Sequence, residues 1–414
     1  MLFFLILPIV LIGMLFNGPL ADRLWDRAIE NYNNGIYAPA NVVFPLRAVM
    51  GSRSAQYNYG LMLEHGTGAA KDLAAARGWY RRAAMRGHPN ASLKLGSFFA
   101  RGIAGRKSQR AALKWYLRAA EGGIVIAQAV AGQMYLDGDG TPKDIAQAAT
   151  WLRRAARQNH VGSKHRLAML LWKNPEHAVE PEEIMVWLRR AAEQGHADSI
   201  NAIGAAYFDG LFGMPRNRGR AADHFARAAA MGNVDAQQNL AQVFEFGDGR
   251  KQNMYSALLW YRRAAENGSV KVQYHLAMTL WRTGTNWQDK VESLKWMEAA
   301  ADKGHEVAMV RLGILHSAGQ ATPRDLEQAE KYWRMAAEKG NADARYLLAN
   351  LLFERGTAES HLEAYLELRK ALNSGKLTGN AEKARLLHDR IWKHFTTRER
   401  EEINWKSRRL APVN

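Results

Sequence analysis

Hydrophobic residues recur along this chain in two alternating helical patterns. In the stretch HPNASLKLGSFFARG, Ala91, Leu95 and Phe98 keep the i, i+4, i+7 spacing of one helical face. The next stretch, ALKWYLRAAEGG, has an alanine three residues before its tryptophan and another four residues after it. A step of 100° per residue places both alanines beside the tryptophan on one apolar stripe. We therefore predict pairs of amphipathic helices joined by short links.

The second pattern ends each time on a small residue, and these end residues are evenly spaced. Successive steps are 35, 36 or 37 residues long. A constant period between about 20 and 50 residues is the signature of a solenoid, in which each repeat packs only on its neighbours. The end residues are Gly51, Gly87, Gly123, Asn159, Gly195, Gly232, Gly268, Gly304, Gly340 and Gly375.

Small residues also stand nine positions after each end residue, inside the first predicted helix of each repeat. Five of them are glycines, although glycine in a helix costs about 0.5–1 kcal/mol relative to alanine. We therefore predict a close approach by a neighbouring helix at this position. The glycines are Gly60, Gly96, Gly132, Gly204 and Gly313. In the links, Asp144 and Asp325 are predicted to cap the helices that follow them.

This repeat closely resembles that of the Sel-one-like repeat (SLR) family, a relative of the tetratricopeptide repeats. The resemblance rests on the 36-residue period, the small residue in the first helix, the aromatic-led second helix and the ending Ala-Ala-x-x-Gly-(His/Asn), and it covers roughly residues 45–376. It implies an all-α fold, a right-handed superhelical α/α solenoid of about nine helix-turn-helix repeats. Members of the family resemble adaptors or scaffolds that bind other proteins, and many bacterial members are exported.

The start of the chain, MLFFLILPIVLIGMLFNGPLA, is uncharged and apolar. About 20 helical residues span a bilayer, so we predict a transmembrane anchor or uncleaved signal sequence at residues 1–21. Arg23 and Arg27 follow this segment, and the positive-inside rule therefore favours a body in the cytoplasm. Long domains, however, can cross a membrane despite such a small excess of positive charge. We predict a single-pass protein of the bacterial inner membrane with a periplasmic body, and the cytoplasmic orientation stays open.

The remaining boundaries follow from the repeat. Residues 22–44 are a connecting segment or N-terminal cap, and residues 45–376 form the solenoid. Residues 377–414 form a C-terminal capping helix and a basic tail, in which the spacing of Thr396 and Glu399 fits a capping box. A polar cap is needed because an open solenoid end would expose apolar surface.

The composition indicates a positive net charge and excludes several kinds of site. The chain has 57 Lys and Arg against 40 Asp and Glu, a formal charge of +17, which favours anionic partners. It has no cysteine, which excludes disulfides and cysteine nucleophiles. Four of the 13 histidines directly follow an end residue, where other repeats carry Asn233, Asn341 or Ser269, so we interpret them as helix caps. These four are His88, His160, His196 and His305.

No catalytic, cofactor or metal site is predicted. The sequence has no HExxH, GxSxG or phosphate-binding glycine loop, and histidines one repeat apart do not converge on one ion. We therefore predict that the protein is not an enzyme. The tryptophans that lead the second helices are interpreted as core residues; they are Trp79, Trp115, Trp151, Trp187 and Trp260.

Arginines recur two and three residues after the lead position of the second helices, which these tryptophans occupy in five repeats. They lie at 200° and 300° on the helical wheel, away from the apolar stripe. They are candidate residues for binding a partner or polyanion: Arg81, Arg82, Arg118, Arg153, Arg154, Arg189, Arg190, Arg227, Arg262, Arg263 and Arg334. Alternatively they form only a solvated face, some paired with nearby glutamates such as Glu193 or Glu266.

The predicted function is that of a membrane-anchored scaffold for protein–protein interactions in a bacterial envelope assembly, such as secretion or exopolysaccharide machinery. The alternative is a polyanion-binding module in which the arginines hold an acidic polysaccharide or an anionic lipid. Nucleic acid is the less favoured partner because the aromatic residues are predicted to be buried.

Overall fold

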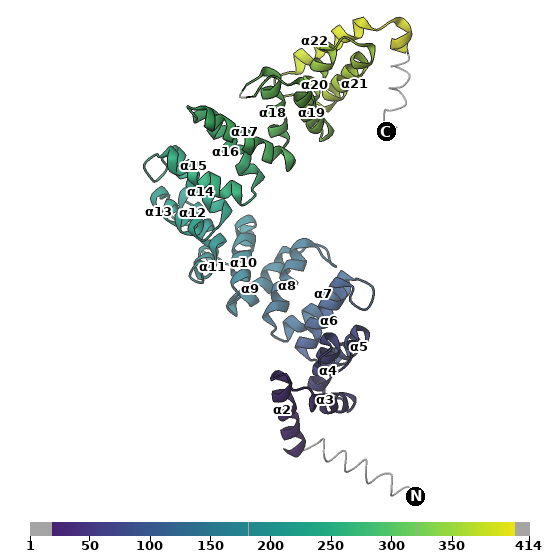
Figure 1. The fold of residues 1–414 in the computed structure, drawn as a ribbon. Coiled ribbons are helices and arrows are strands. Elements are labelled where there is room, and N and C mark those ends of the chain that lie inside the picture. Colours follow the sequence, from purple (N-terminus) through teal and green to yellow (C-terminus); the bar gives the residue numbers. More distant parts are fainter. Residues whose placement is uncertain (1–18, 181, 321, 402–414) are drawn as a thin grey trace. The chain divides into compact units, whose positions relative to one another are not determined.

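The computed structural model describes residues 19–180, 182–320 and 322–401 (Figure 1). These residues form 22 helices, one of them a short 3-10 helix, and no strand. The predicted all-helical solenoid is thereby confirmed. The chain divides after Asn217 into two compact units, and each is described by itself.

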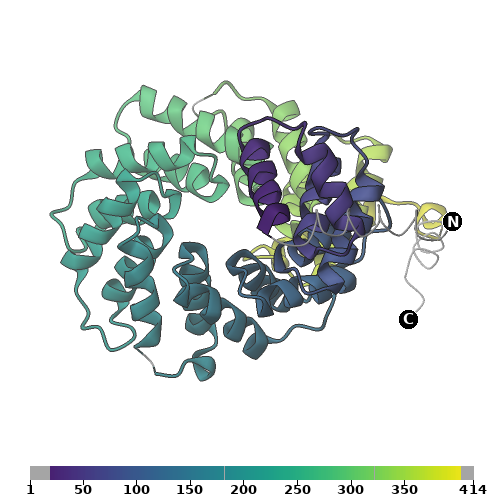
Figure 2. The same ribbon diagram turned by 90° about the horizontal axis from the view of Figure 1, so that it is seen from below.

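The first unit begins with two helices, continues as helix pairs with one extra turn inside the last pair, and ends with the first helix of the next repeat (Figure 2). Each helix packs on the next one along the chain. The elements are α2 (Pro19–Asn33), α3 (Ala40–Val49), α4 (Arg53–His65), α5 (Leu73–Met85), α6 (Pro89–Arg101), α7 (Gln109–Glu121), α8 (Val125–Asp137), α9 (Ile145–Arg157), α10 (Val161–Lys173), η1 (Pro175–His177), α11 (Glu183–Ala192) and α12 (Ala197–Asp209).

The second unit begins with a single second helix, continues as helix pairs and ends in a single helix that packs on the last pair. Its elements are α13 (Arg218–Ala230), α14 (Val234–Phe246), α15 (Met254–Glu266), α16 (Val270–Thr283), α17 (Trp287–Asp302), α18 (Glu306–Ala318), α19 (Leu326–Glu338), α20 (Ala342–Glu354), α21 (Ala358–Ser374) and α22 (Ala381–His394). Even-numbered helices from α4 to α20 are the first helices of repeats, and the odd-numbered helices from α5 to α21 are the second helices.

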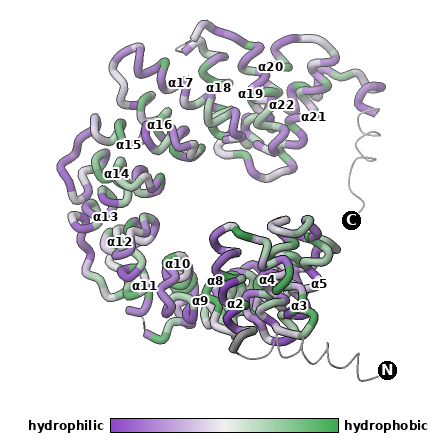
Figure 3. Tube along the Cα trace, turned by 60° about the horizontal axis from the view of Figure 1, so that its bottom comes forward, coloured by the Kyte–Doolittle hydropathy of each residue, from purple (hydrophilic) through white to green (hydrophobic). Residues whose placement is uncertain are grey.

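The core of each unit lies between first and second helices, where the hydrophobic positions of neighbouring helices meet (Figure 3). Alanines of the predicted stripe, such as Ala76, Ala112 and Ala148, are fully buried. Trp115, Trp151 and Trp187 are buried as well, whereas Trp79 and Trp260 are half-buried. The tryptophans thus belong to the core, as their place on the stripe predicts.

The glycines of the first helices make the predicted close approach. A Cβ atom at Gly60 would lie 2.7 Å from Tyr80, one at Gly96 would lie 2.8 Å from Tyr116, and one at Gly132 would lie 2.8 Å from Leu152. The neighbour is in each case the residue that follows the leading tryptophan of the paired second helix. A side chain, rather than a helix backbone, therefore fills the space that glycine leaves.

The predicted helix ends are present. Asp144 accepts a hydrogen bond from the Gln147 N–H at 2.9 Å, and Asp325 accepts from the first turn of α19. The end residues adopt left-handed φ angles, including Asn159 at 70° in place of glycine. The Thr396 N–H donates to Glu399 at 2.8 Å, and the Glu399 N–H donates back to Thr396 at 3.4 Å, as in a capping box.

Glutamines five residues after the end residue bind repeats together in a way that the sequence analysis missed. The buried Nε2 of Gln128 donates at 3.1 Å to the carbonyl of Ala120, in the last turn of the preceding second helix. Gln56, Gln237 and Gln273 donate in the same way to Ala48, Ala229 and Ala265. These bonds satisfy carbonyls that a helix end leaves without a partner.

The predicted inner-membrane localisation is corrected by the structure. In residues 19–401, apart from the two omitted positions, no helix is both long and apolar enough to cross a bilayer. The described end of the predicted segment, residues 19–21, belongs to the charged helix α2, in which Ala21 and Ala28 are buried. Residues 1–18 of that segment lie outside the described residues.

Candidate binding surface

Five arginines stack on the tryptophans that lead their own second helices. Each lies three residues after its tryptophan, and its guanidinium carbon is 4.4–5.1 Å from the indole centroid. All five side chains are exposed. We call them the stacked arginines: Arg82, Arg118, Arg154 and Arg190 in the first unit, and Arg263 in the second.

Stacking leaves the N–H edge of each guanidinium available for a ligand. The indole lies on one side of the guanidinium, whose planar fork of donors matches a carboxylate or a phosphate. The cation–π contact also orients the side chain before a ligand arrives, which reduces the entropy lost on binding. In the first unit, consecutive repeats thus present one oriented cation each.

The arginines two residues after the lead position behave differently, because three of them form ion pairs with the next repeat. Arg153 binds Glu183 at 2.8 Å, Arg262 binds Glu292 at 2.7 Å, and Arg334 binds Glu363. These glutamates lie 29 or 30 residues further along the chain. These three candidate arginines hold repeats together. Their partners are glutamates in the N-terminal half of the next second helix, and not Glu193 or Glu266.

Glu183 illustrates the geometry of these bridges. Arg153 donates to both of its oxygens, at 2.8 and 3.0 Å, and the indole Nε1 of Trp187 donates to Oε1 at 3.0 Å. Burial opposes ionisation of Glu183, but the hydrogen bonds from Arg153 and Trp187 outweigh it and lower its pKa to about 2. Glu292 receives the same contacts from Arg262 and from Trp296 Nε1, at 2.7 and 3.1 Å. A guanidinium and an indole N–H together therefore make a carboxylate site.

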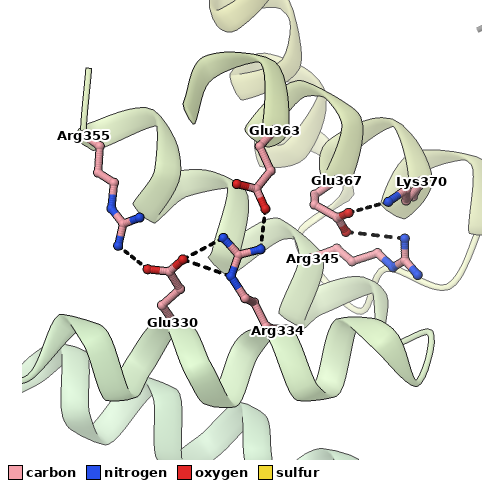
Figure 4. Close-up of polar contacts among 7 residues, drawn as sticks. All are labelled: Glu330, Arg334, Arg345, Arg355, Glu363, Glu367 and Lys370. Carbon is pink, nitrogen blue, oxygen red and sulfur yellow. Dashed lines mark hydrogen bonds and ion pairs between the residues drawn. The ribbon is translucent and has the colours of Figure 1, made fainter. Parts of the chain in front are cut away.

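Arg334 is part of a larger network in the second unit (Figure 4). It donates to Glu330 at 2.7 Å and to Glu363, while Arg355 donates to the other oxygen of Glu330. Beside them Glu367 lies between Arg345 and Lys370, at 3.4 and 2.5 Å. Hydrogen bonding to Arg334 lowers the pKa of Glu363. These cations are occupied by carboxylates of the chain itself.

Three candidate arginines remain. Arg81 and Arg189 are exposed, and Arg189 Nη2 lies 3.3 Å from the sulfur of Met214. Arg227 is exposed and follows His224, which takes the lead position of its helix. The bridging glutamates were missed because a helical wheel treats one helix at a time. Their signal was present in the sequence as a glutamate 29 or 30 residues after an arginine.

Two buried carboxylates were also missed. Glu245 is 2% exposed and accepts hydrogen bonds from Tyr261 Oη at 2.7 Å and from Arg282 at 2.5 Å, with His275 Nε2 at 3.3 Å. Burial and the bond to Glu245 raise the pKa of Tyr261. Glu64 accepts from Tyr80 in the same register, and from Lys94 at 3.0 Å. Both carboxylates join three helices of adjoining repeats.

The histidines after the end residues are helix caps, as predicted. Nδ1 of His88, His160, His196 and His305 accepts the backbone N–H three residues later, at 3.1–3.3 Å. Asn233 and Asn341 make the same bond with an amide oxygen. His88 and His305 also stack on Tyr57 and Tyr274 of the preceding first helix, at 4.6 and 4.5 Å. Among the described residues no group of three or more metal-ligating side chains converges.

These caps make stability depend on pH, because a capping Nδ1 must be unprotonated. Burial lowers the pKa of His88, His160 and His305 below the ordinary 6.5, assisted at His88 by Arg53 and at His160 by Arg166, whereas Glu306 opposes the shift at His305. The unfolded chain then binds protons more readily than the folded one, so stability falls as pH falls below 6.5. Each lost cap costs about 1 kcal/mol.

Urea unfolding of the full chain between pH 7.5 and 5.5 would measure this loss, in a range where carboxylates stay ionised. The control variant carries His88→Asn, His160→Asn and His305→Asn, the residue that other repeats use in this slot. We expect the variant to have a flatter pH profile than the native protein. Equal slopes for the two proteins would contradict the assignment.

Comparison with known proteins identifies the same repeat. The sequence model of the Sel1 repeat matches eight segments, which together cover more than half of the chain: residues 53–88, 89–124, 125–160, 185–196, 197–233, 234–269, 271–305 and 307–341. A comparison with curated protein sequences gives no significant match.

Two solved structures are similar over most of the chain. One is a protective antigen present in uropathogenic Escherichia coli strains and displaying an SLR fold; it is 29% identical, with 80% of this chain and 71% of that chain covered and a TM-score of 0.60. The other is a Sel1 repeat protein from Oxalobacter formigenes, 25% identical, with 74% and 89% covered and a TM-score of 0.62.

Proposed function

This chain belongs to the Sel1 repeat family, and from that premise we propose that it is an interaction scaffold whose stacked arginines bind acidic segments of partner proteins. Sel1 repeat proteins typically mediate protein–protein interactions, and Sel1 repeat solenoids are generally non-enzymatic. The proposal is limited to binding. The membrane-anchored envelope scaffold predicted from the sequence depended on residues 1–21 and is not carried forward.

The observation that carries the proposal is the orientation of Arg82, Arg118, Arg154 and Arg190 in consecutive repeats. Each is exposed, stacked on a tryptophan and separate from the arginines that form bridges between repeats. An extended acidic segment that follows the first unit would meet one oriented guanidinium in each repeat. Several weak contacts of this kind add up to useful affinity when they act on one ligand.

The same arginines support a second candidate, the binding of an acidic polysaccharide or an anionic lipid surface. A regular spacing of cations suits a polymer that repeats its own charge. A protein partner is favoured because protein binding is the typical activity of the family.

We expect a fluorescein-labelled oligo-glutamate peptide to bind the full chain with an affinity that falls steeply with salt. Arg82→Gln, Arg118→Gln, Arg154→Gln and Arg190→Gln together should weaken binding by about tenfold or more, because charge-assisted hydrogen bonds are lost. Fluorescence anisotropy measures the dissociation constants. Lysine at the same four positions keeps the net charge, and this control should recover only part of the affinity because lysine lacks the planar fork.

Unchanged affinity in the four-glutamine variant would contradict the proposal. Competition then separates the candidates. If polygalacturonate or anionic vesicles bound the native chain and oligo-glutamate did not, the second candidate function would be favoured.

A further inference from the structure

We propose that Arg81 of α5 and Trp115 of α7 form a binding site for a carboxylate of an acidic segment in a partner protein. The inference rests on the proposed function, since it places one specific contact within the same surface of the first unit. It follows from a comparison of equivalent interfaces between consecutive second helices.

Two such interfaces contain a carboxylate supplied by the chain itself. One oxygen of Glu183 accepts from Arg153 Nε at 2.8 Å and from Trp187 Nε1 at 3.0 Å. One oxygen of Glu292 accepts from Arg262 Nε at 2.7 Å and from Trp296 Nε1 at 3.1 Å. In both interfaces the glutamate lies 30 residues after the arginine, and the tryptophan four residues after the glutamate.

The interface between α5 and α7 has the arginine and the tryptophan in the same register but lacks the glutamate between them. Ala111 lies 30 residues after Arg81, and Trp115 lies four residues after Ala111. Trp115 packs in the core cluster that contains Ala76 and Tyr80 of α5. Because the repeat period is constant here, Arg81 and the Trp115 indole occupy the places that Arg153 and Trp187 take around Glu183.

The two donors are available for a ligand. Arg81 is exposed and has no ion pair within the part of the chain that the structure describes. Trp115 likewise donates no indole hydrogen bond to another of the described residues. Arg118 lies on the face of Trp115 at 4.8 Å, as Arg190 lies on Trp187 at 5.1 Å. The site thus shares with that of Glu183 the arginine, the indole and the stacked arginine, and residue 111 carries a methyl group where Glu183 carries its carboxylate.

The charge around this site favours a ligand from outside the chain. Residues 73–120 contain eleven Lys and Arg and no Asp or Glu. Lys94 alone among these eleven has an ion pair within the described residues, to Glu64 at 3.0 Å. A partner must therefore supply the carboxylate. An acidic polypeptide is favoured over a phosphate or sulfate polymer because the equivalent interfaces hold glutamate side chains.

The decisive variant is Ala111→Glu, which places an internal carboxylate between Arg81 and Trp115. We expect it to weaken binding of oligo-glutamate to the full chain by about tenfold, as measured by anisotropy. The matched control is Ala75→Glu in α5. Ala75 has the same position in its helix, but Pro45 stands 30 residues before it. This control adds the same charge and should change affinity by less than about threefold.

Two further measurements distinguish a specific site from a general loss of positive charge. Ala111→Glu should raise the thermal midpoint of the protein, and addition of Arg81→Gln should remove that gain, because the internal bridge then cannot form. Trp115→Phe keeps the aromatic ring but removes its N–H, and it should weaken peptide binding by severalfold.

The outcomes separate this inference from the proposed function. Equal effects of Ala111→Glu and Ala75→Glu on binding would overturn the site at Arg81 and Trp115, while the loss of binding in the variant of the stacked arginines would still stand. Failure of oligo-glutamate to bind the native chain at all would overturn both. Binding of polygalacturonate alone, with the same dependence on Arg81, would replace the protein partner by an acidic polysaccharide.

Discussion

We expect the substitution Gly313→Ala to lower the free energy of unfolding of the second unit by about 2–3 kcal/mol. A Cβ atom at this position would lie 2.2 Å from Nε1 and 2.5 Å from Cδ1 of Trp333. The indole is 4% exposed and donates to the carbonyl of Val310 at 3.2 Å. It would have to leave a packed position and lengthen that bond. The gain in helix propensity from alanine, about 1 kcal/mol, does not offset this cost.

Gly78→Ala is the control, because Gly78 also lies inside a helix but no side chain or other helix comes within 4 Å of its added Cβ. We expect this variant to be stabilised by about 0.5–1 kcal/mol. Urea unfolding followed by circular dichroism measures both changes. If both variants shifted in the same direction, the packing explanation for the repeated glycine would be wrong.

The second large effect is expected from Glu245→Gln, which removes a buried charge with almost no change of shape. Tyr261 is fully buried, and its hydroxyl keeps an acceptor only if the amide oxygen of the new glutamine takes the place of the carboxylate oxygen. Arg282 loses its ion pair. Because the Arg282 side chain is 63% exposed, water recovers part of that loss. We expect a destabilisation of about 2–3 kcal/mol.

A double-mutant cycle with Tyr261→Phe measures the coupling between the two side chains. Glu338→Gln serves as the control for the change in net charge, since Glu338 is exposed and has no ion pair in the described part of the chain. Its effect should stay within about 0.5 kcal/mol. Additive effects of Glu245→Gln and Tyr261→Phe would show that the buried hydrogen bond contributes little.

The sequence predicts best those features that recur in every repeat. The period, the apolar stripe of Ala76 and Ala112, the close approach at Gly60 and the histidine caps all follow from spacing and propensity, and the structure contains them. The stripe and the caps depend on residues a few positions apart, where the geometry of a helix is fixed. The Sel1 repeat is therefore recognisable from the sequence alone.

Contacts between repeats are harder to predict, because the wheel angle of a residue says nothing about the helix that packs beside it. Arg153 and Arg154 are adjacent and both polar, yet Arg153 binds Glu183 of the next repeat while Arg154 stacks on Trp151 of its own helix. The membrane localisation failed for a related reason. A window of apolar residues ending at Ala21 ignores that Ala21 packs inside a charged helix.

The ion pairs between repeats also bear on how such a protein changes in length during evolution. Lys94 and Glu64, Arg153 and Glu183, and Arg262 and Glu292 are each separated by 30 residues, less than one period. Duplication or deletion of a whole 36-residue block keeps the equivalent positions of neighbouring repeats 30 residues apart, whereas an insertion of a few residues between two such positions alters that spacing. Recombination in whole repeats can therefore lengthen the array and keep the register in which a cation of one repeat meets a carboxylate of its neighbour.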